Sequence, residues 1–261
     1  GERISHNLVS IPLQVNPCPY LKFDYFVQRD VYADDPFTPD VVEASMPAEL
    51  ALLIRNTGAG NANKVTIHSL KPEIVENEKG LAVSFNLMDY PLDKTALNGS
   101  TAYLGLGDVS IGTIASQESS VAQWWLTSSI EGHFVGLDAH VTHANTWGNP
   151  APSLIDPDVG VHKLIRSVVA DADRLPDFLV SDDSDLYGTP NEIYTAKGDV
   201  MSVHTANVLG EAEMVGAEVE LQITASPSRS GWNYGYLTKA GLFRYTITRI
   251  VRGDGEGIPL R

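Results

Sequence analysis

Apolar and polar side chains alternate in several segments along this sequence, and this pattern limits the folds that the chain can adopt. Residues 21–27, 135–142, 218–223 and 243–248 all follow this period of two. An extended segment with one apolar and one polar face is typical of antiparallel strands in a sandwich or barrel. Gly and Pro residues separate these segments at turn spacing, and no stretch carries a sustained helical stripe. The sequence therefore predicts an all-β fold.

The apolar runs divide the chain into three parts. Residues 1–16 hold one run with Pro12 inside it, and a proline within a strand favours a sheet edge or a strand that inserts into another sheet. A short acidic segment between two later apolar runs sets the next domain boundary. We expect an N-terminal extended strand at 1–16, a β-sandwich at 17–168 and a second, smaller β-sandwich at 169–261. A single large β domain is the alternative.

Composition excludes several classes of protein. The chain carries 18 Lys+Arg against 33 Asp+Glu, a net charge of −15, which argues against binding to the nucleic-acid backbone. No apolar run is long enough to span a membrane. The single cysteine, Cys18, excludes an internal disulfide framework. The first residues lack Met and a signal-peptide pattern, so we expect a processed product or a segment or repeat of a longer chain.

One block of the sequence resembles a known family of modules. Residues 49–67 read Glu-Leu-Ala-Leu-Leu-Ile-Arg-Asn-Thr-Gly-Ala-Gly-Asn-Ala-Asn-Lys-Val-Thr-Ile. They are similar to the V-x-N-x-G-x-G-x-A-x-N-V-x-V hairpin of bacterial cell-adhesion-related (CARDB-like) immunoglobulin-like modules. Residues 106–116 and 121–134 resemble the late strands of that family. The resemblance covers residues 45–143, and the insertion at 68–100 departs from the compact family pattern.

The resemblance has consequences for fold and function. It implies that both sandwiches are immunoglobulin-like and antiparallel. It also implies that the glycines of the hairpin occupy a turn with positive φ and that its Asn side chains bond local backbone. Modules of this type in large secreted or surface proteins resemble spacers and adhesive or assembly units more than enzymes. The implied location is therefore extracellular or at the cell surface.

Clusters of histidine and aspartate give only weak metal sites. Asp138 and His140 share a strand face, which supplies two ligands where zinc needs at least three. A calcium ion at the expected domain junction would take its oxygen ligands from five aspartates. These are Asp171, Asp173, Asp182, Asp183 and Asp185. The regular calcium-loop motif is missing, so a solvated acidic turn is the alternative, and no cofactor is expected.

Catalytic motifs do not occur in the sequence. It contains no Gly-x-Ser-x-Gly elbow, no phosphate-binding Walker loop and no dinucleotide fingerprint. We therefore expect no enzymatic activity, and a hydrolase that uses the face of Asp138 and His140 is the least favoured alternative.

Several residues are candidates for surface contacts. Trp125, Trp232 and Tyr234 would stack on sugars or on a neighbouring subunit. Asn98 lies in the Asn-Gly-Ser triplet that accepts N-linked glycans. Residues 95–162 contain no Lys or Arg, whereas residues 226–261 form a basic end that includes Arg249 and Arg252. Such opposed charge favours head-to-tail association.

These features predict a non-enzymatic structural or adhesive module of an extracellular or cell-surface assembly. Its main partner would be itself, as a homopolymer or as tandem repeats. The N-terminal strand, with Leu8, Ile11 and Leu13, would add to the sheet of a neighbour and link copies into filaments. The alternative is a carbohydrate-binding accessory module, with glycans as partners.

Overall fold

The computed structural model describes residues 17–28, 30–35, 38, 40–74, 85–87, 109–144, 155–169, 173, 175–182, 188–215, 218–236 and 248–258. Every regular element in these ranges is a β-strand, which confirms the all-β prediction. Among the described residues, no helix is long and apolar enough to cross a membrane. The chain divides into two compact units, Gly1–Met201 and Ser202–Arg261, and each is described by itself.

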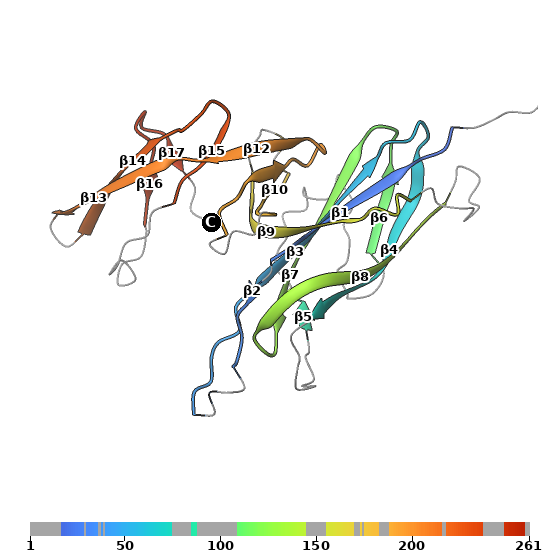
Figure 1. Ribbon diagram of the computed structural model, residues 1–261, viewed down its shortest axis with the longest axis horizontal. Coiled ribbons are helices and arrows are strands. Elements are labelled where there is room, and N and C mark those ends of the chain that lie inside the picture. The colour runs from blue at the N-terminus through green and yellow to red at the C-terminus, as the bar shows by residue number, and fades with distance from the viewer. Residues whose placement is uncertain are drawn as a thin grey trace, which may run out of the picture. The chain divides into compact units, whose positions relative to one another are not determined.

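The first unit is built on a mixed sheet whose strands lie in the order β11-β10-β9-β1-β3-β7-β5 (Figure 1). The bounds are β1 Leu21–Val27, β3 Ala48–Asn56, β5 Phe85–Leu87, β7 Ser119–Ser128, β9 Gly160–Val168, β10 Asp177–Val180 and β11 Glu192–Tyr194. These neighbours are antiparallel except for β1 and β9, which run parallel. Strand β1 therefore joins segments far apart in the sequence.

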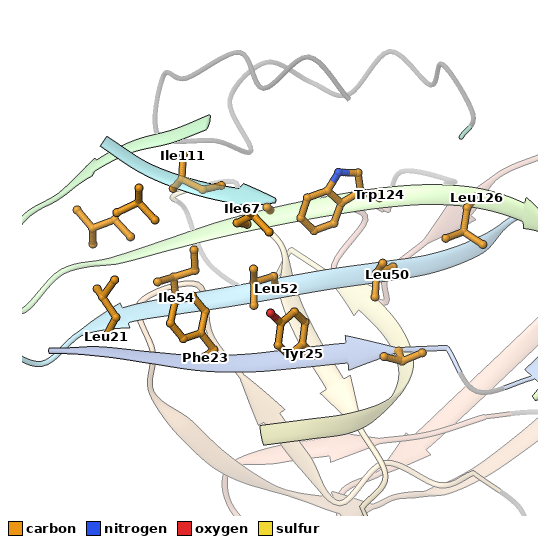
Figure 2. Close-up of a cluster of buried hydrophobic side chains, with 14 of the residues drawn as sticks. Leu21, Phe23, Tyr25, Leu50, Leu52, Ile54, Ile67, Ile111, Trp124 and Leu126 are labelled. Carbon is orange, nitrogen blue, oxygen red and sulfur yellow. The ribbon is translucent and has the colours of Figure 1, made fainter. Parts of the chain in front are cut away.

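A smaller antiparallel sheet of the first unit has the order β2-β8-β4-β6. Its strands are β2 Asp30–Val31, β4 Ala62–Ile74, β6 Val109–Ile114 and β8 Gly132–Ala144. Alternate side chains of β1, β3 and β7 pack with side chains of β4 and β6 in one core. Figure 2 shows Leu52, Ile54 and Trp124 from the large sheet beside Ile67 and Ile111 from the small one. Full burial stabilises each large apolar side chain by about 1.5–3 kcal/mol.

The second face of the large sheet is also covered, which differs from the polar face that the alternation predicts. Phe26, Ala51 and Leu53 on this face are fully buried. They belong to a second apolar cluster with side chains from β9, β10 and β11, and Phe26 stacks on Phe178 at a centroid distance of 4.3 Å. The later strands of the sheet therefore fold over the face that the sequence pattern assigned to solvent.

The hairpin that carries the family resemblance is organised by Asn56. Its Nδ2 donates to the carbonyl oxygens of Gly60, Ile114 and Ala115 at 2.8–3.1 Å, and its Oδ1 accepts from the backbone N–H of Gly58 and Tyr20. The expectation that Asn bonds local backbone therefore agrees with the structure.

The glycines of this hairpin serve a different purpose from the one expected. The positive-φ prediction is wrong for Gly58 and Gly60, which are not among the residues with positive φ. A Cβ on Gly58 would lie 2.2 Å from the backbone N of Tyr20, and one on Gly60 would lie 2.1 Å from the carbonyl oxygen of Pro17. Glycine is needed here because the backbone of residues 17–20 packs directly on the turn.

The second unit consists of paired strands. The part of β12 (Val200–Thr205) from Val203 to Thr205 pairs in parallel with β15 (Trp232–Tyr234), while β13 (Asn207–Val215) pairs antiparallel with β14 (Glu218–Ser226). Strand β16 (Ile250–Val251) pairs with β17 (Gly257–Ile258).

The two compact units meet after Met201 in the sequence. Strands β9 and β10, on either side of the expected boundary after residue 168, are antiparallel neighbours in one sheet. The predicted N-terminal strand at 1–16 lies outside the described residues.

Candidate functional site

The second face of the large sheet carries a cluster of charged side chains centred on His162 of β9. Its Nδ1 lies 2.6 Å from Oδ2 of Asp182, and its Nε2 lies 3.3 Å from Oδ1 of Asp24. Arg55 on β3 donates from Nη2 to Oδ2 of Asp24 at 2.6 Å. We call Asp24, Arg55, His162 and Asp182 the ionic cluster. It joins β1, β3, β9 and the residues after β10.

The register of the sheet explains why these side chains meet. Phe26 pairs with His162 across the parallel β1–β9 ladder, and Asp24 lies two residues before Phe26, so its side chain points to the same face. A Cβ on Gly160, which pairs with Asp24, would lie 2.5 Å from Oδ1 of Asp24 and 2.7 Å from Nε2 of His162. Gly160 therefore leaves the room in which the imidazole reaches the carboxylate.

The ionic cluster keeps His162 positively charged. Burial disfavours the charged ring, but hydrogen bonds and attraction from Asp182 and Asp24 outweigh it and raise the pKa of His162 to about 9. Burial also acts to raise the pKa of Asp24, but hydrogen bonds and attraction from His162 and Arg55 lower it overall. At neutral pH His162 is an imidazolium with both N–H groups directed at carboxylates. It therefore has no free lone pair to accept a proton or bind a metal.

Aromatic rings enclose the imidazolium. Phe26 lies at a centroid distance of 5.3 Å from the His162 ring, and Tyr194 lies at 4.5 Å. The side chains of His162 and Asp24 are about nine-tenths buried. Strong pKa perturbation often marks a functional site, but structural ion networks perturb pKa values too. Because both ring nitrogens of His162 are bonded to carboxylates of the same chain, we interpret the ionic cluster as a structural link between strands.

A second polar cluster lies on the same face around Glu49, which is only 4% exposed. Gln123 donates to Oε1 of Glu49, and the hydroxyl of Ser167 donates to Oε2 at 3.0 Å. Burial is the main influence on this carboxyl and raises the pKa of Glu49. Along β3 the buried pair Ala51 and Leu53 thus lies between Glu49 and Arg55. Both polar ends of this face are occupied by internal partners.

Among the described residues of the first unit, the most exposed apolar side chains lie between β2 and β3. We call the described residues from Tyr32 to Met46 the projecting loop, which extends away from the strands in Figure 1. Val42 is 91% exposed, and Tyr32, Val41 and Met46 are each more than half exposed. The same loop contains four acidic residues: Asp34, Asp35, Asp40 and Glu43.

Hydrogen bonds fix the conformation of the projecting loop. The backbone N–H of Met46 donates to the carbonyl oxygen of Tyr32 at 2.8 Å. The N–H of Glu43 donates to Oδ1 of Asp34 at 3.0 Å, and the N–H of Asp35 donates to Oε2 of Glu43 at 2.9 Å. The hydroxyl of Ser45 anchors the loop to the carbonyl oxygen of Ser128 at 3.0 Å. The exposed Val41 and Val42 therefore lie next in the chain to Glu43, which these hydrogen bonds link to Asp34 and Asp35.

The second unit exposes apolar side chains beside positive charge. Ile250 and Val251 of β16 are 37% and 43% exposed, and the neighbouring Arg249 is exposed. Arg249 makes no ion pair with any of the residues that the structure describes. Arg252 binds Asp254 at 2.6 Å and also pairs with Glu256. Of the two candidate arginines, Arg249 is thus the one available for an outside partner.

The expected calcium ligands are occupied by other groups where the structure describes them. Asp182 binds His162, and Asp173 forms an ion pair with Lys197 at 3.2 Å. The described residues contain no group of three or more His, Cys, Asp or Glu side chains arranged to hold a metal. Asp171, Asp183 and Asp185 lie outside the described residues, and the calcium site stays a prediction.

The other predicted site residues are distributed as follows. Trp125 is half-buried on β7 and pairs with Glu49 across the ladder, whereas its neighbour Trp124 lies in the core. Asp138 and His140 lie on β8, whose described backbone sets His140 opposite His68. Trp232 and Tyr234 lie on β15. Asn98, Leu8, Ile11 and Leu13 lie outside the described residues.

Sequence reasoning missed the ionic cluster and the projecting loop. The sequence does not single out His162, because nothing local links it to Asp24, 138 residues away. The loop did carry a signal, since Val41 and Val42 interrupt an acidic segment without belonging to any alternating run.

The chain matches no model of a protein family, and comparison with curated proteins and with solved structures finds no match either.

Proposed function

We propose that this chain is a non-enzymatic structural or adhesive module of an extracellular or cell-surface assembly, and that it associates head to tail with copies of itself. The observation that carries this proposal is the projecting loop, in which Val42 is 91% exposed beside hydrogen-bonded acidic residues. Exposed apolar groups that are contiguous and rimmed by polar residues are typical of protein interaction sites.

The charge distribution supports a second copy as the partner. Residues 202–261 contain six basic and six acidic residues, so the whole net charge of −15 belongs to residues 1–201. The exposed Ile250 and Val251 beside Arg249 offer apolar and positive groups that complement the acidic loop. Complementary charge steers association and sets which surfaces meet. A contact between two different surfaces of the same chain forms open filaments when it does not close into a ring.

The polar clusters support a role without catalysis. The imidazole of His162 is held as a cation by two carboxylates, and Glu49 is enclosed by Gln123 and Ser167. These groups stabilise the large sheet from inside. The ionic cluster links β1 to β9 across the sheet. A sheet linked in this way suits a module that keeps its shape between its contacts with neighbouring copies.

The family resemblance supports the same assignment. We include in the proposal that the chain is related to CARDB-like immunoglobulin-like modules. The predicted strand with Leu8, Ile11 and Leu13 gives a second means of linking copies, because an added strand gains main-chain hydrogen bonds from an open sheet edge.

Sedimentation velocity of the intact chain over a wide concentration range tests the proposal. We expect species larger than the monomer as concentration rises, and weaker association in Val42→Asp, which places a charge among the exposed apolar side chains of the loop. Val159→Asp is the matched control, because Val159 is an exposed valine outside the loop. A chain that stays monomeric at every concentration, or equal association of the two variants, would contradict the proposed contact.

Removing residues 1–16 separates the two means of linking. If the predicted strand joins copies, electron microscopy shows filaments of the intact chain that disappear in the shortened chain. If the projecting loop alone is responsible, the shortened chain polymerises as before, and strand addition is wrong.

A further inference from the structure

We propose that Trp232, Tyr234 and Tyr236 of the second unit form a binding strip for a linear, uncharged oligosaccharide of β-linked, gluco-configured pyranoses. The three aromatic residues are spaced two apart, on β15 and just after it. Residues two apart on an extended chain share a face and are separated by about 6.6 Å. The rings of Tyr234 and Tyr236 follow this geometry, with centroids 6.2 Å apart and planes inclined by 34°.

The intervening residues fix which face the aromatic residues occupy. Asn233 accepts from the backbone N–H of Ser228 at 3.0 Å and donates to the carbonyl oxygens of Arg229 and Gly231 at 2.8 and 3.0 Å. Gly235 packs closely on Val208, since a Cβ at this position would lie 2.4 Å from Cγ2 of Val208. Asn233 and Gly235 thus contact neighbouring segments on one face of the backbone, and the three aromatic residues belong to the opposite face.

The strip is accessible and has a polar neighbour. Trp232 is 36% exposed, Tyr236 is 55% exposed and Tyr234 is half-buried. In the parallel ladder Trp232 pairs with the buried Val203, and Tyr234 pairs with the exposed Thr205. Paired residues share a face, so an apolar side chain supports one end of the strip and a hydroxyl flanks its middle.

The chemistry of this surface fits a sugar chain with flat faces. Aromatic faces carry partial negative charge and attract the partially positive hydrogens of C–H groups. A gluco-configured, β-linked pyranose has only axial C–H groups on its two faces and directs its hydroxyl groups outward from the ring edge. The phenolic hydroxyls of the strip and the hydroxyl of Thr205, which pairs with Tyr234 in the ladder, are the groups that would bond those edges.

The shape and charge of the unit favour the glycan over a protein segment. The three members of the strip are all aromatic and are spaced two apart along the chain, and none of them is an aliphatic side chain of the kind that fills a pocket. The six basic residues of the unit equal its six acidic ones, so no net charge selects an anionic polymer. This inference does not depend on self-association, because its residues lie outside the projecting loop and outside β16.

The test is affinity measurement by calorimetry of the intact chain with a β-1,4-linked glucose hexasaccharide, and with an α-1,6-linked glucan as the mismatched probe. We expect binding to the β-linked probe alone, with the association constant about tenfold lower in Trp232→Ala, because one stacked aromatic contact is lost. We expect Tyr236→Ala, at a position beyond β15, to lower the association constant as well. Tyr236→Phe keeps the ring and should retain most of the affinity.

Tyr32→Ala is the matched control, because Tyr32 is 53% exposed but lies in the first unit. Circular dichroism confirms that each variant is folded. The proposal is overturned if the intact chain does not bind the β-linked probe, or if Trp232→Ala and Tyr236→Ala bind it as well as Tyr32→Ala. Equal binding of both glucans overturns the assigned linkage. Loss of self-association in Trp232→Ala without loss of sugar binding would show that the strip contacts protein instead.

Discussion

Strand β3 of the first unit and strand β14 of the second are each nine residues long but have contrasting surroundings. In β3 every residue except Arg55 is buried, with an apolar core on one face and a second apolar cluster flanked by polar groups on the other. In β14 the described side chains from Glu220 onward are exposed or half-buried, and β14 pairs only with β13 among the described residues. Two-stranded ribbons are marginally stable alone.

The difference indicates a division of roles. The first unit contains large buried side chains and closed polar clusters, which give it stability of its own. The described part of the second unit exposes Trp232, Tyr236, Ile250 and Val251, which add little to a core. Exposed apolar groups on short strand pairs are explained more simply as surfaces for partners. The following predictions test this contrast.

The largest effect is expected in the core of the first unit. Trp124 is 2% exposed between the two sheets, and Trp124→Ala leaves a cavity that lowers the free energy of unfolding by about 3–5 kcal/mol. Urea unfolding followed by circular dichroism measures the change. Trp124→Phe is the control: it keeps a ring and removes an indole N–H that has no hydrogen-bond partner among the described residues, so its loss is smaller. Equal losses would contradict a cavity as the cause.

The ionic cluster predicts an intermediate effect that depends on pH. His162 has a pKa of about 9 when folded and 6.5 as its ordinary value, so its contribution is complete below pH 6.5 and is lost as pH rises through 9. Because the side chain of Asp182 is about one-third exposed, solvent screens its pairing with His162, and we expect a contribution of about 1–2 kcal/mol. Urea unfolding between pH 6 and 10 measures it.

His162→Gln is the control for this pH dependence, since it removes the titrating group and keeps a side chain able to donate a hydrogen bond. The variant is expected to be less stable than the intact chain near pH 6 and to lose little further stability up to pH 9. A variant whose stability falls with pH as steeply as that of the intact chain would show that other groups cause the loss.

The smallest effect is expected in the second unit. Val251 is 43% exposed on β16, and Val251→Ser should change the free energy of unfolding by less than about 0.5 kcal/mol. Thermal unfolding measured by circular dichroism checks this. A loss comparable with that of Trp124→Ala would mean that β16 belongs to a core, and the contrast between the units would fail.

The sequence predicts the strands well but predicts their surroundings poorly. Alternation in residues 21–27 identifies β1 and its core face, because local pattern and burial agree there. Two features of the sequence indicate that the other face is buried as well. Phe26 lies on that face, and the continuous run Leu-Ala-Leu-Leu-Ile at 50–54 is typical of a strand buried on both faces. Neither feature identifies β9–β11 as the strands that cover the face.

The ionic cluster was beyond the reach of sequence patterns for a related reason. It depends on the parallel pairing of β1 with β9, which is fixed by tertiary packing and leaves no local motif. The exposed aromatic residues were easier to find, since Trp232 and Tyr234 are large side chains two apart near Gly residues. Their common face follows from spacing alone, whereas their accessibility required the structure.

The most direct test of the head-to-tail contact is a charge exchange measured by sedimentation velocity. Asp40 is exposed on the projecting loop and Arg249 is exposed beside β16. We expect Asp40→Arg and Arg249→Asp each to weaken self-association, and the chain carrying both substitutions to recover it, because every contact between copies regains opposite charges. No recovery in the double variant, or no loss in either single one, would contradict the contact.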